Sequence, residues 1–180
     1  MHNNTYESQM ETSPLMRQLP TALLLTVLAS STFHAAPSDN PLMLYQGTWH
    51  ITRKSAGANA KPDELKSQCA LLGKFFTCQQ TVNGSVTSLL IFVATNQPGH
   101  YATQNVLPEG RATGKGEVEI TGNRWVFTSS WNQGSKTTRY RTTNVFADKN
   151  HIHFEQEESA DGVHWETKDS GDELRTFPSK

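Results

Sequence analysis

The chain has 180 residues, with 16 Lys and Arg against 17 Asp and Glu, and its formal net charge is −1 at neutral pH. This length supports one domain with a hydrophobic core of its own. Because the charge is balanced and no basic run occurs, the composition argues against nucleic acid or an anionic membrane surface as the main partner.

An apolar run without charge occupies residues 21–29, TALLLTVLA. It matches the roughly 7–15-residue apolar core of a secretory signal and is too short to cross a bilayer, which needs about 20 residues. The first 15 residues carry Glu7 and Glu11, the wrong charge for the start of a signal, whereas initiation at Met16 places the cation Arg17 ahead of the apolar core. We therefore predict a signal peptide that starts at Met16.

This segment sets the predicted domain boundaries. Residues 1–35 are expected to be an N-terminal extension and signal peptide, with cleavage after Ser31 or Ala35, and residues 36–43 a flexible lead-in. The folded domain is expected to span residues 44–178. No lipobox cysteine follows the apolar core and no other stretch approaches 20 apolar residues, so we expect an exported, periplasmic or secreted protein without a stable membrane span.

From Tyr45 onward the chain alternates short β-like runs with turn signals. The dipeptides Asn83-Gly84, Gly122-Asn123 and Asp161-Gly162 are typical of hairpins. Only Ala60–Gln68, with Pro62-Asp63-Glu64 near its start, is expected to begin a short helix.

Alternation of apolar and polar residues supports strands with one buried face. Val118 and Ile120 alternate with glutamates, and Ile152 and Phe154 alternate with histidines and a glutamate. About nine or ten antiparallel strands in hairpin order favour closure, because an open sheet leaves unpaired edges. We predict an all-β fold, an up-and-down antiparallel β-barrel of about 8–10 strands, with a β-sandwich as the competing fold. A barrel of this size either fills with side chains or holds a small molecule.

The two cysteines, Cys69 and Cys78, are an even pair in a chain predicted to be exported, which indicates a disulfide. If Gly73-Lys74 forms a two-residue hairpin turn, the cysteines fall directly opposite each other. They then form a non-hydrogen-bonded pair with Cα atoms about 4.5 Å apart, within disulfide reach. A metal-binding or redox pair is disfavoured because the C-x-x-C spacing is absent.

One predicted strand carries candidate ligand contacts. Arg139 and Arg141 alternate with Tyr140 and Thr142, so one set must face the barrel interior. Inward Tyr140, Thr142 and Asn144 would orient a polar ligand group, whereas inward arginines would suit a carboxylate. Arginines that face outward and pair with glutamates are the favoured arrangement. The aromatic residues expected in the core and barrel lining are Trp125, Phe127, Trp131, Phe146 and Trp165.

Histidines raise the alternative of a metal or haem. His151 and His153 share a strand face with Glu155 and Glu157, and two imidazoles with a carboxylate suit Zn²⁺ or Cu²⁺. A solvated outer face is the favoured interpretation, and no cofactor is expected. Candidates for lone haem ligation are His50, His100 and His164.

A family resemblance rests on Gly47-Thr48-Trp49, a G-x-W motif on the first predicted strand, together with the segments 69–84, 140–146 and 159–166 (CALLGKFFTCQQTVNG, YRTTNVF and SADGVHWE). With the strand count, these segments resemble bacterial exported lipocalin-like, calycin-type β-barrel proteins of uncharacterised function. The resemblance implies a barrel closed at one end by Gly47 and Trp49 under a basic residue from a late strand. Arg175 is the best match for that residue and Arg141 a weaker one.

The leading functional hypothesis is a non-enzymatic lipocalin-like barrel that binds a small apolar or amphipathic ligand. Tyr140, Thr142, Asn144, the two arginines beside them, Trp125 and Phe127 are the cavity candidates. No G-x-S-x-G, H-E-x-x-H, P-loop or G-x-G-x-x-G motif supports an enzyme. The alternatives are an exported interaction or inhibitor module acting through the loops Gly57–Asp63 or Pro108–Gly114, and a metal- or haem-dependent activity.

Overall fold

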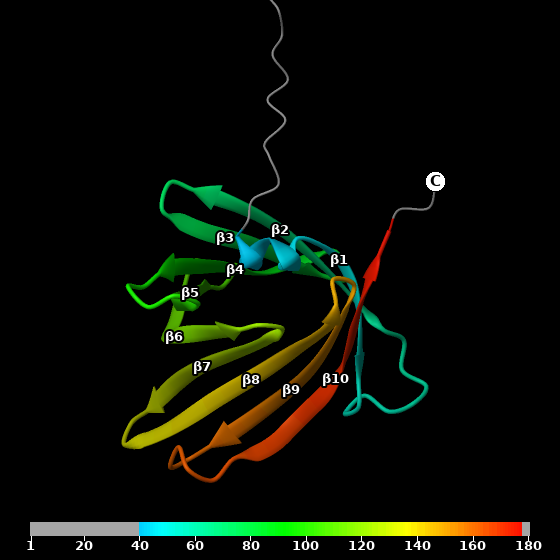
Figure 1. Ribbon diagram of the computed structural model, residues 1–180. Helices are drawn as coiled ribbons and strands as arrows, with labels where there is room; N and C mark the ends of the chain where they lie inside the picture. Colours follow the sequence, from blue (N-terminus) through cyan, green and yellow to red (C-terminus); the bar gives the residue numbers. More distant parts are fainter. Residues whose placement is uncertain (1–39, 178–180) are drawn as a thin grey trace, which may run out of the picture. The chain divides into compact units, whose positions relative to one another are not determined.

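The computed structural model describes residues 40–177, so the predicted signal peptide, its start at Met16 and its cleavage sites lie outside the described residues. A short 3-10 helix is followed by ten strands (Figure 1). The elements are η1 (Pro41–Tyr45), β1 (Gly47–Arg53), β2 (Asp63–Leu72), β3 (Phe75–Val82), β4 (Ser85–Ala94), β5 (His100–Val106), β6 (Ala112–Thr121), β7 (Arg124–Gln133), β8 (Lys136–Asp148), β9 (His151–Ser159) and β10 (Glu166–Thr176).

The strands form a closed antiparallel barrel. Each pairs with the next in the chain, and β10 returns to pair with β1, so the ring is complete and no strand of it is an open edge. This confirms the predicted all-β, up-and-down barrel and rules out the sandwich. Among residues 40–177, no helix is long and apolar enough to cross a membrane.

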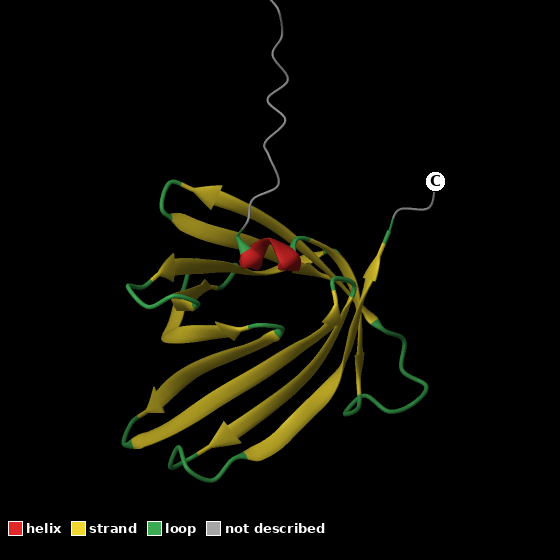
Figure 2. Ribbon diagram, in the orientation of Figure 1, coloured by secondary structure: helices red, strands yellow, loops and turns green. Residues whose placement is uncertain are grey.

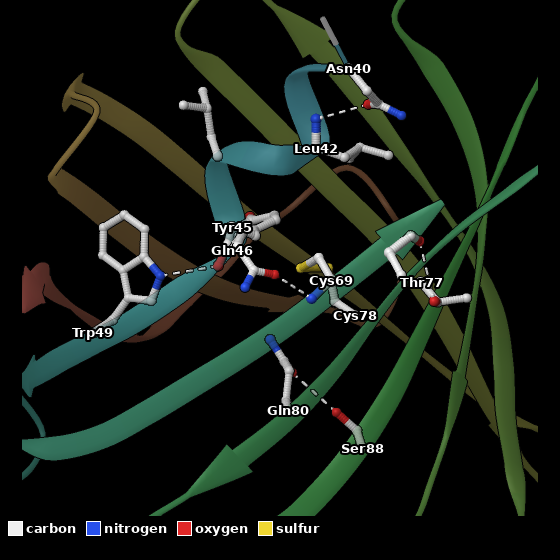
Figure 3. The surroundings of a disulfide bond; sticks show 12 residues. Asn40, Leu42, Tyr45, Gln46, Trp49, Cys69, Thr77, Cys78, Gln80 and Ser88 are labelled. Carbon is white, nitrogen blue, oxygen red and sulfur yellow. Dashed lines mark hydrogen bonds between the residues drawn. A yellow bond between two sulfur atoms is a disulfide. The ribbon is translucent and has the colours of Figure 1, made fainter. Parts of the chain in front are cut away.

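The β2–β3 hairpin has the predicted register. Gly73 adopts a φ of 62° in the turn, Leu72 pairs with Phe75, and Cys69 lies opposite Cys78. The cysteines form the predicted disulfide, with their Cα atoms 4.1 Å apart. Figure 3 shows that the backbone N–H of Cys69 also donates to Oε1 of Gln46 at 2.5 Å, which ties this hairpin to the start of β1.

The helix expected over Ala60–Gln68 is wrong, because residues from Asp63 onward belong to β2. Leu65 and Ser67 are buried, at 8% and 1% exposure, while their neighbours Glu64 and Lys66 are exposed. This period of two is that of a strand. Pairing with both β1 and β3 outweighs the weak local helix preference of the charged residues.

The last residues of the predicted lead-in, 41–43, belong to η1, and the flexibility expected of residues 36–43 stays a prediction. Asn40 caps η1 by accepting a hydrogen bond from the backbone N–H of Leu42 at 3.0 Å, and Pro41 occupies the first turn. Leu42 is fully buried and Tyr45 is 8% exposed. The Pro- and Asn-containing sequence looks like a linker, but η1 places Leu42 and Tyr45 in the hydrophobic core.

The helix η1, red in Figure 2, closes one end of the barrel. It packs against β2 on one side. On the other side, the ring of Tyr45 contacts Trp125, Phe127 and Phe146. The rings of Tyr45 and Trp125 are edge-on, with their centroids 4.9 Å apart. Because η1 touches strands on both sides, it lies across the interior. Much of the buried aromatic core gathers beneath it, and Trp125 and Phe146 are 1% and 5% exposed.

Arg175 of β10 fastens η1 in place. Its guanidinium lies 4.1 Å from the ring centroid of Trp49 and donates to the carbonyl oxygens of Leu44, Gln46 and Lys149. A planar guanidinium can stack and donate several hydrogen bonds at once. Trp49 is fully buried and donates from Nε1 to the carbonyl oxygen of Tyr45 at 3.2 Å.

Gly47 completes this end of the barrel. It has a φ of 132°, and a Cβ there would lie 2.5 Å from a guanidinium nitrogen of Arg175. Only glycine allows that approach without displacing the arginine. Gly47, Trp49 and Arg175 therefore lie together, whereas Arg141 is elsewhere on the barrel.

Candidate ligand-binding site

The barrel encloses a partly open cavity of about 570 Å³. Tyr45 of η1 contributes to its wall, as do β2–β10. Apolar lining residues include Leu65, Leu90, Phe92, Phe127 and Trp131, and polar ones include Gln80, Thr103, Asn105, Ser129, Thr142 and Asn144. Both kinds of surface are therefore offered to a bound molecule.

Gly116 of β6 allows a close approach between strands in the wall of the cavity. Gly116 pairs with Thr103 of β5 and Ser129 of β7, and all three line the cavity. A Cβ on Gly116 would lie 2.7 Å from the carbonyl oxygen of Thr128 and 2.8 Å from Oγ1 of Thr103. The strand can therefore approach its neighbours only without a side chain at this position.

Of the predicted cavity residues on β8, the even-numbered ones line the cavity and the odd-numbered ones do not. Tyr140, Thr142 and Asn144 line the cavity together with Phe127 of β7. Trp125, also a candidate, lies in the core and does not line the cavity.

Arg139 and Arg141 do not line the cavity and lie on the outer face of β8. Arg141 makes a bidentate pair with Glu157, with donor–acceptor distances of 2.6 and 2.7 Å, and its guanidinium stacks 4.1 Å from the ring of Trp165. The pKa of Glu157 is lowered mainly by this hydrogen bonding. Trp165 is thus an outer-surface residue, not the barrel lining that was expected. The even-numbered residues of β8 face inward because Asn144 and Phe146 are buried among the core aromatics.

The predicted metal ligands His151 and His153 both contact the carboxyl group of Asp172. Both imidazoles lie within hydrogen-bond distance of Oδ1 of Asp172, at 3.0 and 3.1 Å, and these contacts, the one to His151 foremost, lower the pKa of that carboxyl. Glu155 instead accepts from Thr167. Within residues 40–177, no group of three or more His, Cys, Asp or Glu is arranged to hold a metal ion.

The histidines considered for haem do not reach the cavity. His100 is hydrogen-bonded to Gln97, His164 is bonded to Asp161 and exposed, and His50 is exposed on β1. None of the three lines the cavity. The described residues therefore offer no support for the metal- or haem-dependent alternative.

Glu173 of β10 is a cavity residue that the sequence analysis missed. Its direct neighbours across the sheet are Ile51 and Ile152, both buried, and no described residue donates a hydrogen bond to its carboxyl. Burial raises the pKa of Glu173 from its usual 4.5 to about 7, while the charge of Arg53 opposes this rise. A signal was present in the sequence: Arg175 was expected to close the barrel, and residues two apart on a strand share a face.

Two buried amide oxygens add to this polar region. Nδ2 of Asn144 donates to the Tyr45 hydroxyl at 2.5 Å, but Oδ1 of Asn144 and Oδ1 of Asn105 have no hydrogen-bond partner within the described part of the chain. Burial, and secondarily the charge of Glu173, raises the pKa of Tyr45 well above its usual value, so its hydroxyl stays neutral. Unpaired buried polar atoms are costly and rare in folded proteins.

Comparison with known proteins does not identify a family for this chain. No protein-family model matches the chain, and no curated protein matches it. Among solved structures it is similar to the one titled "Crystal Structure of Rv2717c from M. tuberculosis", at 17% identity and a TM-score of 0.44, covering 79% of this chain and 99% of that chain. The closed ring of ten strands itself shows that the chain is a β-barrel protein.

Proposed function

We propose that this protein is a lipocalin-like, non-enzymatic barrel that binds a small amphipathic molecule in its cavity. The observation that carries the proposal is the cavity of about 570 Å³, with both apolar walls and unpaired polar atoms. Small-molecule sites are usually concave, of roughly 300–1,000 Å³, and mostly apolar with a few polar groups that orient the ligand.

The two kinds of wall have separate roles in this proposal. Phe92, Phe127 and Leu90 would remove the apolar part of the ligand from water, at about 25 cal/mol for each Å² covered. Asn105 and Asn144 would bind its polar group, because each presents an amide oxygen that lacks a partner within residues 40–177. Trp131 and Tyr140, which are 44% and 36% exposed, lie where the cavity meets solvent.

Binding of the neutral fluorescent probe N-phenyl-1-naphthylamine tests the proposal. Thr142 lines the cavity and its neighbour Thr143 does not, so Thr142→Trp should fill the cavity and Thr143→Trp is the matched control. We expect the wild type and Thr143→Trp to bind the probe and Thr142→Trp to lose at least about tenfold in affinity, the effect of about 1.4 kcal/mol.

Ser129→Leu provides a second cavity variant should Thr142→Trp fail to fold. Thermal unfolding establishes whether each variant is folded. Equal binding by folded cavity variants and the control, or no binding by the wild type, would overturn the proposal.

We also propose that the domain is exported after cleavage of a signal peptide that lies within residues 1–35. The apolar run at residues 21–29 and the Cys69–Cys78 disulfide support this, because such bonds persist in oxidising compartments. N-terminal sequencing of the purified native protein should begin after Ser31 or Ala35. Material that retains residues 1–31 would contradict it.

A protein partner stays a prediction. Residues 57–62 of the first proposed loop belong to the connection between β1 and β2 and are exposed, and Asp63 begins β2. Residues 112–114 of the other proposed loop belong to β6, and Gly114 is part of the cavity wall.

A further inference from the structure

The cavity carries a single kind of charge. Among the described residues that line the cavity, Glu173 is the only Asp, Glu, Lys, Arg or His. Its carboxyl receives no hydrogen bond from any described residue. A ligand group that fills this region therefore meets a carboxylate without a partner.

The unpaired neutral atoms have the same polarity. Oδ1 of Asn144 and Oδ1 of Asn105 are both hydrogen-bond acceptors; they are buried atoms of residues that line the cavity, and neither has a donor within residues 40–177. The Tyr45 hydroxyl already accepts from Asn144. An ionised carboxylate can only accept hydrogen bonds, and a protonated amine supplies up to three donors together with a positive charge. We propose that the ligand of this barrel is an organic amine, bound as its ammonium ion, with an apolar chain or ring.

An anionic amphiphile does not fit the same cavity. Its carboxylate would face Glu173, and no Lys, Arg or His lines the wall to offset the repulsion. Arg53, whose charge acts on Glu173, is already bound to Asp169 at 3.0 Å and lies 3.8 Å from Asp63. Arg139 and Arg141, which sequence analysis considered for a carboxylate ligand, lie outside the barrel.

The groups that surround Glu173 make this recognition pH-dependent. β1 contributes the cation Arg53 and the neutral Ile51, η1 contributes the Tyr45 hydroxyl, and β9 contributes neutral Ile152. Since an ammonium ion is attracted only to the ionised carboxyl, its binding competes with protonation of Glu173. Affinity should therefore be highest above pH 7 and fall as the pH decreases below it.

This inference rests on the proposed ligand-binding function, and a matched series separates the two. Decylammonium, 1-decanol and decanoate have the same chain and different head groups, and each competes with N-phenyl-1-naphthylamine at pH 8, below its micellar concentration. A charge-assisted hydrogen bond corresponds to about a tenfold to hundredfold gain in affinity. Decylammonium should therefore displace the probe at a concentration at least tenfold lower than decanol, and decanoate should be the weakest.

Glu173→Gln should bring the ratio of the decylammonium and decanol affinities close to one. Glu64→Gln makes the same change on an exposed residue of β2 and should leave this ratio at its wild-type value. If Glu173→Gln does not fold, the wild type alone tests the inference, because the ratio should fall at least fivefold between pH 8 and pH 5.5. Equal affinities for the three compounds, a preference for decanoate, or a ratio independent of pH would overturn the amine assignment while the probe still binds. Failure of the probe itself to bind would instead overturn the proposed function.

Discussion

Glu173→Gln is expected to change the unfolding free energy of the empty barrel in a pH-dependent way. Relative to the wild type, the variant should be more stable at pH 8 than it is at pH 4. The carboxyl is largely buried between Ile51 and Ile152, and its pKa rises from the usual 4.5 to about 7. A group whose pKa is raised on folding binds its proton more tightly in the folded state. Wild-type stability therefore decreases as the pH rises from about 4.5 to about 7, and the loss is complete above that pH.

The size of the effect follows from the two pKa values. Each pKa unit corresponds to about 1.4 kcal/mol, so the rise from 4.5 to about 7 corresponds to a loss of about 3 kcal/mol on ionisation. A glutamine has no such titration. Any constant cost of burying its amide cancels when the difference between variant and wild type is followed with pH.

Urea unfolding monitored by tryptophan fluorescence measures this difference from pH 4 to pH 8.5. The stability of Glu173→Gln minus that of the wild type should grow by about 3 kcal/mol across this range. Glu64→Gln, on the exposed face of β2, is the matched control and should show little pH dependence. A difference for Glu173→Gln that stays constant within about 0.5 kcal/mol would refute the burial of an ionisable carboxyl in the cavity.

Three further changes test how the barrel is closed. Leu42→Ala removes a fully buried side chain from η1 and should cost about 2–5 kcal/mol of unfolding free energy in urea. Replacing Cys69 and Cys78 by Ser opens a loop with a sequence separation of 9 and should cost about 2–3 kcal/mol in the same assay without reductant. Arg175→Lys keeps the charge but loses the fork that holds three carbonyl oxygens, and should lower stability by about 2 kcal/mol.

Each of these has a matched control. Leu174→Ala, on a side chain that is 51% exposed, should cost much less than Leu42→Ala, and equal costs would mean that η1 is not part of the core. Addition of a reductant should weaken the wild type and leave the double serine variant unchanged. Arg111→Lys, on an exposed loop, should be nearly neutral, and a similar result for Arg175→Lys would contradict its closing role.

Most of the fold could be predicted because its determinants are local. Alternation at Val118 and Ile120 identifies a strand with one buried face, and a turn at Gly73 is enough to place Cys69 opposite Cys78. The helix expected around Glu64 failed because pairing with two neighbouring strands, which no local window contains, decided the conformation.

The cavity was only partly predictable. On β8 both faces carry polar residues, so hydrophobicity could not choose between Arg141 and Thr142, and the inward face was decided by packing of Asn144 and Phe146 in the core. Glu173 stood in a polar run, DELRT, that looks like a solvated strand. Glu173 is buried by Ile51 of β1, which is distant in the sequence, and by Ile152 of β9, which a loop separates from β10.

The most direct test of ligand binding in the barrel is to locate a bound molecule on the protein. Intermolecular nuclear Overhauser effects between unlabelled 1-decanol and isotope-labelled protein locate it residue by residue. We predict contacts from the decanol methylenes to Phe92, Phe127 and Thr142, which line the cavity. Contacts confined to exposed apolar residues such as Leu72 and Phe75, or none at saturating decanol, would contradict the account.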